Sequence, residues 1–265
     1  MSSLKDKVIW ITGASSGIGE ALALDLAKRG ARLILSARRE EELKRVGSLT
    51  KLPELDLMIL PLDLKNTSGA SALTAQVINK FGRIDYLINN GGMSQRSSVL
   101  DTKEDIEREI MEINYFAQVN IAKAVLPYMI RQRSGHITVI SSIAGKFGFF
   151  LRSSYSAAKH ALHGYFESLR LENETNGIRV LMVCPGKINT SVSLNAITGK
   201  GEKHAKMDPS HEEAMSAEVC ATKIIKAMLN EEEELYVGGK ELLIIKIRRF
   251  FPSLFSKLIR KQSPY

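Results

Sequence analysis

Short runs of apolar residues, rich in valine and isoleucine, alternate along the chain with longer stretches in which apolar residues recur at helical spacing. The runs predict strands at Val8–Ile11, Arg32–Ser36, Leu57–Leu62, Ile84–Ile88, His136–Ile140, Ile178–Val183 and Leu235–Val237, and the stretches predict helices at Glu20–Arg29, Ser71–Lys80, Lys103–Arg131 and Ser153–Thr175. Strands that alternate with helices throughout indicate an α/β fold with a doubly wound parallel sheet, flanked by helices on both faces. We find no repeat and no linker, so residues 1–239 are predicted to form one domain.

Two segments carry features beyond this alternation. Residues 191–216 mix serine, asparagine, glycine, lysine and histidine without periodicity, and we expect them to form a mobile flap over the substrate. The predicted helix at 103–131 has apolar residues on more than one face, so we expect it to pack against the sheet and against a second subunit. Together with the helix at 153–175, it would form the interface of a homodimer or homotetramer.

The composition is that of a soluble protein with a sizeable core, with 44% hydrophobic and 25% charged residues in a chain of 265. The two cysteines, Cys184 and Cys220, offer no disulfide framework and are expected to be buried thiols of a reducing compartment. The first residues lack the apolar core of a secretory signal, and no apolar run approaches the ~18 residues that span a membrane. We therefore expect a cytoplasmic protein.

The net charge of +8 is concentrated at the C-terminus. Residues 240–265 carry seven cations and one anion, which leaves only +2 for residues 1–239. The body of the protein therefore lacks the basic surface that nucleic-acid binding requires, and the tail carries no recognised nucleic-acid-binding motif. We expect no nucleic-acid partner.

A glycine-rich turn joins the first predicted strand to the first predicted helix. It contains Gly13, Ser15, Ser16, Gly17, Ile18 and Gly19. Glycines allow a tight turn and close backbone approach, and the helix N-terminus presents unpaired N–H groups to an anion. With its flanking strand and helix, the turn is typical of a dinucleotide pyrophosphate site, whereas glycines alone would indicate only a tight turn. Asn89–Gly92 follow the fourth predicted strand, at an edge where open parallel sheets bind ligands.

Arg38 and Arg39 follow the second predicted strand, where an NAD-binding unit usually places an acidic residue that holds the ribose 2′-hydroxyl. Arginine suits a 2′-phosphate, so the pair favours NADP over NAD as the cofactor. The alternative is that the arginines belong to a solvated helix start and form ion pairs with Glu40, Glu41 and Glu42.

Tyr155 and Lys159 are four residues apart, so they would lie one turn apart on the same face of a helix. A free phenol has a pKa of ~10, and a nearby ammonium would lower that pKa and make the tyrosine usable as both acid and base. Ser142, at the end of the fifth predicted strand, could hydrogen-bond the same substrate oxygen. Asn114 lies among apolar neighbours and must find hydrogen-bond partners, either in a structural role or as part of a site. Taken alone, the Tyr-x-x-x-Lys spacing often occurs by chance on amphipathic helices.

With these residues in order, the chain from about Lys5 to Tyr236 resembles the NAD(P)-dependent short-chain dehydrogenase/reductase family, which has a Rossmann fold. The resemblance implies a catalytic tetrad of Asn114, Ser142, Tyr155 and Lys159. It also implies that the glycine loop and Arg38 bind the cofactor together with Asp63, Leu64, Asn90, Gly91, Tyr155, Lys159, Pro185, Gly186, Ile188 and Thr190. Gly91 replaces the alanine of the family's Asn-Asn-Ala-Gly signature, which removes one methyl group. We expect no metal site.

These residues and the resemblance imply an oxidoreductase that transfers a hydride between NADP(H) and the carbonyl or alcohol carbon of a small substrate. Tyr155 would be the general acid or base, Lys159 would lower its pKa and hold the nicotinamide ribose, and Asn114 would hold a water. One alternative is a reductase of acyl-carrier-bound β-ketoacyl groups. Such enzymes often carry arginine where Asn173–Asn176 stand, which counts against it, although Arg131 and Arg133 remain available. A second alternative, a non-catalytic dinucleotide-binding protein, would need the glycine loop but not the tetrad.

Two short segments, Ser36–Arg39 and Asn90–Ser97, most resemble the group named dehydrogenase/reductase member 7. This resemblance implies a membrane-associated enzyme that acts on lipophilic carbonyl compounds such as retinoids and steroids.

The tail extends beyond the family pattern and is rich in large apolar residues. They recur at three- and four-residue steps from Leu243 to Leu258, interrupted by Pro252 and flanked by cations. This composition is typical of a helix that lies in a membrane interface. We therefore expect residues 241–262 to form two short helices around Pro252 that dock the enzyme peripherally on the inner face of a membrane. The alternative is that the phenylalanines cap the substrate pocket or pack in a dimer.

Overall fold

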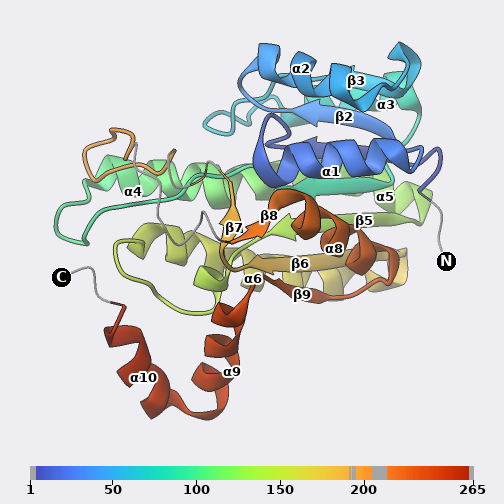
Figure 1. Ribbon diagram of the computed structural model, residues 1–265. Coiled ribbons are helices and arrows are strands. Elements are labelled where there is room, and N and C mark those ends of the chain that lie inside the picture. Colours follow the sequence, from blue (N-terminus) through green and yellow to red (C-terminus); the bar gives the residue numbers. More distant parts are fainter. Residues whose placement is uncertain (1–3, 191, 193–194, 205–213, 263–265) are drawn as a thin grey trace.

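The computed structural model describes residues 4–190, 192, 195–204 and 214–262. Seven strands form one parallel sheet in the order β3-β2-β1-β4-β5-β6-β9 (Figure 1). They are β1 (Val8–Thr12), β2 (Arg32–Ser36), β3 (Leu57–Ile59), β4 (Tyr86–Asn89), β5 (Gly135–Ile140), β6 (Ile178–Pro185) and β9 (Glu234–Val237). The strand order reverses between β1 and β4, which is where open α/β sheets bind ligands. The predicted doubly wound fold is confirmed.

Helices cover both faces of the sheet and create two hydrophobic layers. α1 (Gly17–Lys28), α2 (Glu40–Thr50) and α8 (Ala217–Leu229) pack on one face, and α3 (Ala70–Phe81), α5 (Ala117–Gln132) and α6 (Ser153–Asn173) on the other. Side chains of a strand point alternately to the two faces, so in β1 Ile9 and Ile11 join the first layer while Val8 and Trp10 join the second. The continuous apolar runs of the sequence reflect this burial on both faces.

The single long helix predicted at 103–131 is interrupted at a position that matters for the site. It consists of α4 (Glu104–Met111), a π-helical turn η2 (Glu112–Phe116) and α5. Asn114 lies within this turn and is fully buried. Short π-helical turns are frequent at functional sites, because the extra residue moves side chains out of the regular helical register.

The predicted flap at 191–216 is described only in part, because residues 191, 193–194 and 205–213 lie outside the described residues. Its mobility therefore stays a prediction. In the described part, Ile197 is buried and pairs with Gln95 and Lys203, and β7 (Ile188–Asn189) pairs with β8 (Met215–Ser216). These contacts tie the flap segment to the loop that follows β4.

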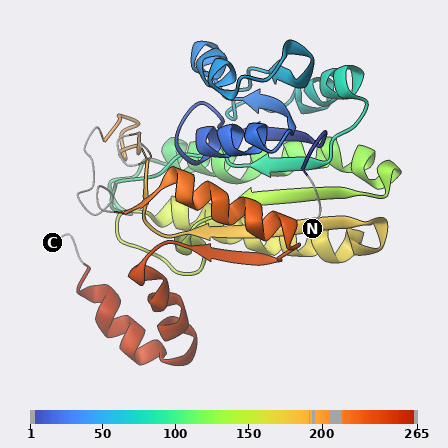
Figure 2. The same ribbon diagram turned by 45° about the vertical axis from the view of Figure 1, so that its right-hand side comes forward.

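The tail forms two helices around Pro252, as the sequence predicts. After a short 3-10 turn η5 (Lys240–Leu242), α9 (Leu243–Phe250) and α10 (Pro252–Arg260) pair with each other and project away from the sheet (Figures 1 and 2). We call residues 243–260 the C-terminal hairpin. None of its residues is buried, and in the described part of the chain no helix is long and apolar enough to cross a membrane.

Candidate active site

The glycine loop follows β1 and reaches the end of β4. Gly13 and Gly17 have positive φ angles of 65° and 58°, which favour glycine. A Cβ at Gly13 would lie 2.7 Å from the Gly91 Cα, and a Cβ at Gly19 would lie 2.2 Å from the Gly13 carbonyl oxygen. Asn90 Nδ2 fixes this close approach by donating to the Gly13 carbonyl at 3.1 Å. The loop is thus an open backbone cradle.

The first turn of α1 faces this cradle. Ser16 is the N-cap residue, and its side chain makes no capping hydrogen bond to the helix. The first N–H groups of α1, at Gly17, Ile18 and Gly19, can therefore bind an anion, as the predicted pyrophosphate site requires. Ser15 precedes them and is buried. The far side of the cradle is formed by the Thr190 side chain, whose methyl group would lie 3.2 Å from a Cβ at Gly17.

Arg38 and Arg39 are exposed at the end of β2. The neighbouring acidic residues form ion pairs elsewhere, Glu40 and Glu41 with Lys44 and Glu42 with Arg45. Among the described residues Arg38 forms no ion pair, and Arg39 Nη2 approaches Ser15 Oγ at 3.5 Å. The hydrogen bond from Arg45 and, after it, the charge of Arg39 lower the pKa of Glu42, so the alternative of ion pairing with Glu40–Glu42 applies to Arg39 rather than to Arg38.

Asp63 and Leu64 follow β3, at the carboxyl end of the sheet, where the glycine loop also lies. The Asp63 carboxylate accepts a hydrogen bond from the Lys65 amide at 3.0 Å and is exposed. Leu64 explains the glycine at position 91, because a Cβ there would lie 2.5 Å from the Leu64 Cδ1. The replacement of alanine by Gly91 is therefore more than the loss of a methyl group, since Leu64 occupies the space.

Asn114 anchors the loop after β4 through three hydrogen bonds. Its Oδ1 accepts from the Met93 amide at 3.0 Å, and its Nδ2 donates to the carbonyls of Met93 and Ile110, both at 3.0 Å. Gly92 fits between Asn114 and Lys159: a Cβ there would lie 2.7 Å from Asn114 Oδ1 and 3.6 Å from Lys159 Nζ. Asn114 therefore stabilises the loop after β4 and also lies next to the candidate site.

Ser142 and Tyr155 meet where α6 packs against the turn that follows β5. Ser142 caps a 3-10 turn, η3 (Ile143–Gly145), and its Oγ accepts a hydrogen bond from the Ala144 amide at 3.1 Å. Burial raises the pKa of the Tyr155 phenol above its usual range, and the charge of Arg152 and a hydrogen bond with Ser142 offset this only in part. At neutral pH, Tyr155 therefore keeps its proton.

Lys159 lies one helical turn from Tyr155, but its charge is directed elsewhere. Its Nζ donates to the Ile140 carbonyl at 2.8 Å and lies 5.8 Å from the centroid of the Tyr155 ring. Burial lowers the pKa of Lys159 to about 8, although Cys184 acts in the opposite direction. Lys159 is not among the groups that shift the pKa of Tyr155 in this structure, so its expected effect on the tyrosine stays a prediction.

The segment after β6 faces the glycine loop. Pro185 ends the strand, and the Gly186 amide donates to the Val237 carbonyl at 2.8 Å, next to β9. Ile188 is buried in β7, and Thr190 lies against Gly17. The structure thus brings together the glycine loop and the segment after β6, the two parts of the predicted cofactor site.

Gln95 is a functional candidate that the sequence analysis missed. It is fully buried, its Oε1 accepts from the Tyr155 amide at 3.1 Å, and its Nε2 donates to Ser97 and Thr102 at 3.2 and 3.1 Å. It therefore fixes the first turn of α6, and with it Tyr155, to the loop after β4. Its position in the polar stretch after a strand end was the available signal.

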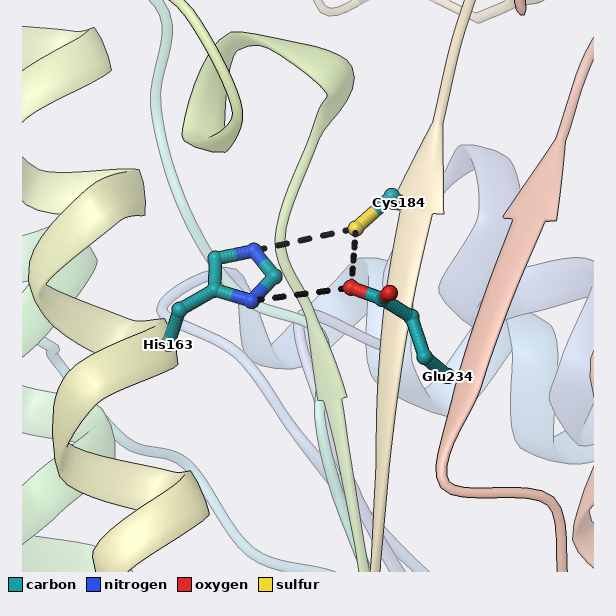
Figure 3. Close-up of side chains that lie close together, drawn as sticks. All are labelled: His163, Cys184 and Glu234. Atoms are coloured by element: carbon teal, nitrogen blue, oxygen red, sulfur yellow. Dashed lines mark hydrogen bonds and ion pairs between the residues drawn. The ribbon is translucent and has the colours of Figure 1, made fainter. Parts of the chain in front are cut away.

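A second polar cluster lies behind the tetrad. His163 on α6, Cys184 on β6 and Glu234 on β9 point toward one another (Figure 3), with their ligand atoms within 4.8 Å. These side-chain types bind zinc in other proteins. Here the Lys146 ammonium lies 2.5 Å from the Glu234 carboxylate and 3.1 Å from His163 Nδ1, so it supplies the positive charge of the cluster. The cluster is thus an ion pair that joins the loop after Ser142 to α6 and β9.

Comparison with known proteins agrees with this architecture. The family model of the short chain dehydrogenases matches residues 7–200. Human dehydrogenase/reductase SDR family member 7 is 41% identical over 91% of this chain and 73% of its own length, and a Drosophila melanogaster family protein 7-like is 39% identical over 99% and 82%.

Solved structures show the same fold. A short-chain dehydrogenase from Streptomyces avermitilis superimposes with a TM-score of 0.80 at 28% identity, covering 98% of this chain and all of its own. A Burkholderia phymatum short chain dehydrogenase/reductase in complex with NAD gives 0.84 at 21% identity, covering 96% of both chains. With the glycine cradle and the tetrad in place, these likenesses show that the chain belongs to the short-chain dehydrogenase/reductase family of oxidoreductases.

Proposed function

We propose that the protein is an NADP-dependent oxidoreductase that interconverts a carbonyl group and an alcohol in a small lipophilic molecule. The observation that carries this proposal is the position of Tyr155 beside Ser142 and one helical turn from the buried Lys159, next to the glycine cradle. A proton donor and a hydrogen-bonding hydroxyl at one point are what a carbonyl oxygen needs as it gains negative charge.

The residues present fit a nicotinamide dinucleotide, since the open first turn of α1 suits a pyrophosphate and the strand ends meet at the switch point. When bound, NADPH supplies the hydride. Tyr155 would donate its proton to the substrate oxygen, and Ser142 would orient that oxygen. Because burial keeps Tyr155 protonated, the tyrosine carries the proton that reduction of a carbonyl requires.

The preference for NADP is supported by Arg38. Its exposed guanidinium stands at the end of β2 without a carboxylate partner among the described residues, where the 2′-phosphate of NADP would lie. No acidic side chain follows β2 directly to hold a 2′-hydroxyl.

The proposed substrate class rests on an apolar cluster beside Tyr155. Ile106, Ile110, Ala158 and Ile197 form its buried part, and Met93, Met111, Tyr115 and Tyr155 pack against it. Methionine and isoleucine side chains next to Tyr155 favour contact with apolar molecules over sugars. The proposal is tested by NADPH consumption with steroid, retinal, quinone, sugar and β-ketoacyl substrates. Turnover of sugars alone would refute the lipophilic class, and no turnover with any carbonyl would refute the reductase.

We further propose that the protein is a homo-oligomer and that the C-terminal hairpin binds an anionic membrane surface. Phe116, in the helical segment expected at a subunit interface, is 46% exposed, which supports the first. The second is supported by the exposure of Phe250 and Phe251, 67% and 62%, on a hairpin with no buried residue and several cations.

A further inference from the structure

Glu241 lies in η5, directly before the C-terminal hairpin, and its side chain extends to the segment after β6. Its Oε1 accepts a hydrogen bond from the Lys187 amide at 2.8 Å and a second one from the Gly239 amide at 3.0 Å. One carboxylate oxygen therefore bridges the backbone after β6 and the backbone after β9. Lys187 stands next to Gly186 and directly before β7, within the proposed nicotinamide-binding segment.

Glycines make room for this carboxylate. A Cβ at Gly186 would lie 2.3 Å from Glu241 Oε1, and a Cβ at Gly238 would lie 2.6 Å from the same atom. Neither glycine has a positive φ angle. The observed position of the carboxylate therefore depends on the absence of a side chain at Gly186 and Gly238, since a Cβ at either position would displace it.

The carboxylate is held as an anion. Burial acts to raise the pKa of Glu241, but hydrogen bonds from the backbone amides of Gly239 and Lys187 bring that pKa below its usual range. Hydrogen bonds from backbone N–H groups to a charged acceptor are among the stronger ones in proteins. The bridge is thus present at neutral pH.

We propose that Glu241 is a positioning residue that holds the Pro185–Lys187 backbone in the geometry that binds nicotinamide, and that it does so from the root of the hairpin. This inference rests on the proposed function in that it assigns nicotinamide to this segment. It adds a role for a residue outside the tetrad and the glycine loop. It also links the hairpin to the cofactor site, because η5, which contains Glu241, leads directly into α9.

The test uses the full-length protein with Glu241→Ala, Glu241→Gln and, as a control, the exposed neighbour Lys240→Ala. Hydrogen–deuterium exchange of peptides within 181–190 reports on the bridge, and titration with NADPH reports on the cofactor site. In Glu241→Ala, the Lys187 amide loses its acceptor, so we expect faster exchange there and about a tenfold higher Kd for NADPH. Glu241→Gln keeps an oxygen acceptor of the same shape, so it should stay within about threefold of the wild type, as should Lys240→Ala.

Gly238→Ala provides a second way to break the bridge, by pushing the carboxylate away. We expect it to raise the Kd severalfold in the wild-type background and to add much less in the Glu241→Ala background, where only the approach of the new Cβ to the Gly186 backbone, at 3.3 Å, remains. Wild-type exchange within 181–190 in Glu241→Ala, or a full additional effect of Gly238→Ala there, would overturn the proposal. If the wild type binds no nicotinamide nucleotide while exchange responds to Glu241→Ala, the bridge stands and the proposed function fails.

Discussion

At the scale of single residues, Tyr155 is the proposed proton donor. Because its phenol stays protonated at neutral pH, it can donate a proton to a carbonyl oxygen. Tyr155→Phe keeps the ring and removes only the donor. We expect kcat to fall by roughly 10²–10⁴-fold, the usual worth of a general acid, with the Kd for NADPH nearly unchanged. Steady-state kinetics and a binding titration measure the two effects, and near-normal turnover would remove Tyr155 from the mechanism.

Lys159 is expected to lower the stability of the protein without cofactor. Its pKa is about 8 in the folded state and 10.5 as the ordinary value. Below pH 8 the lysine is protonated in both states, so the cost of burying its charge is constant. Between about pH 8 and 10.5 the unfolded chain binds more protons than the folded one, so the free energy of unfolding rises with pH.

Lys159→Met removes this buried charge but leaves the Ile140 carbonyl without its donor. We expect the net effect at pH 7 to be a gain of about 1–3 kcal/mol in the free energy of unfolding, and the rise between pH 8 and 10.5 to shrink. Turnover should be lost. Denaturant unfolding at pH 7 and pH 10 measures the change, and a methionine variant that is less stable with the same pH dependence would contradict the assignment.

At the scale of elements, we propose that the end of β2 sets the choice between NADP and NAD. Arg38 stands there with its guanidinium exposed, so Arg38→Ala should raise the Kd for NADPH about tenfold or more and barely change that for NADH. Lys44→Ala, on the neighbouring α2 and paired with Glu40 and Glu41, is the matched control. Equal weakening of NADPH and NADH binding by Arg38→Ala would mean that the arginine is only structural.

The sequence predicted the elements well where one property determines them. Apolar runs gave the strands, because both faces of the sheet are buried, and Pro252 gave the break between α9 and α10. The π-helical turn around Asn114 was not predictable, because it depends on hydrogen bonds to Met93, a residue in a loop 21 positions away.

The sequence predicted the residue types and positions of the candidate site but not its electrostatics. The four-residue spacing of Tyr155 and Lys159 places both on one helical face, yet spacing says nothing of burial or of the competing Ile140 carbonyl. Glu241 was missed for a similar reason, because its partner Lys187 is 54 positions away and the bond depends on how β6 and β9 end. Contacts that are distant in sequence require the fold.

At the scale of the whole molecule, positive charge and exposed apolar surface coincide in the C-terminal hairpin. The tail carries most of the net charge of +8, and it projects from the sheet in both views (Figures 1 and 2). The hairpin contacts the body through the Phe255 ring, which lies 5.4 Å from that of Phe147 in the loop between Ser142 and α6.

We predict that the full-length protein co-sediments with anionic lipid vesicles at low salt, and that added salt weakens binding, because each surface cation contributes about 1 kcal/mol of screened attraction. Phe250→Ser with Phe251→Ser should abolish binding by removing the exposed rings. Leu55→Ser is the matched control, because Leu55 is 82% exposed but lies outside the hairpin, and it should bind like the wild type. Intact protein that stays in the supernatant with anionic vesicles at low salt would refute membrane binding. If light scattering then shows a dimer that the double phenylalanine variant loses, the hairpin is a contact between two copies of the chain.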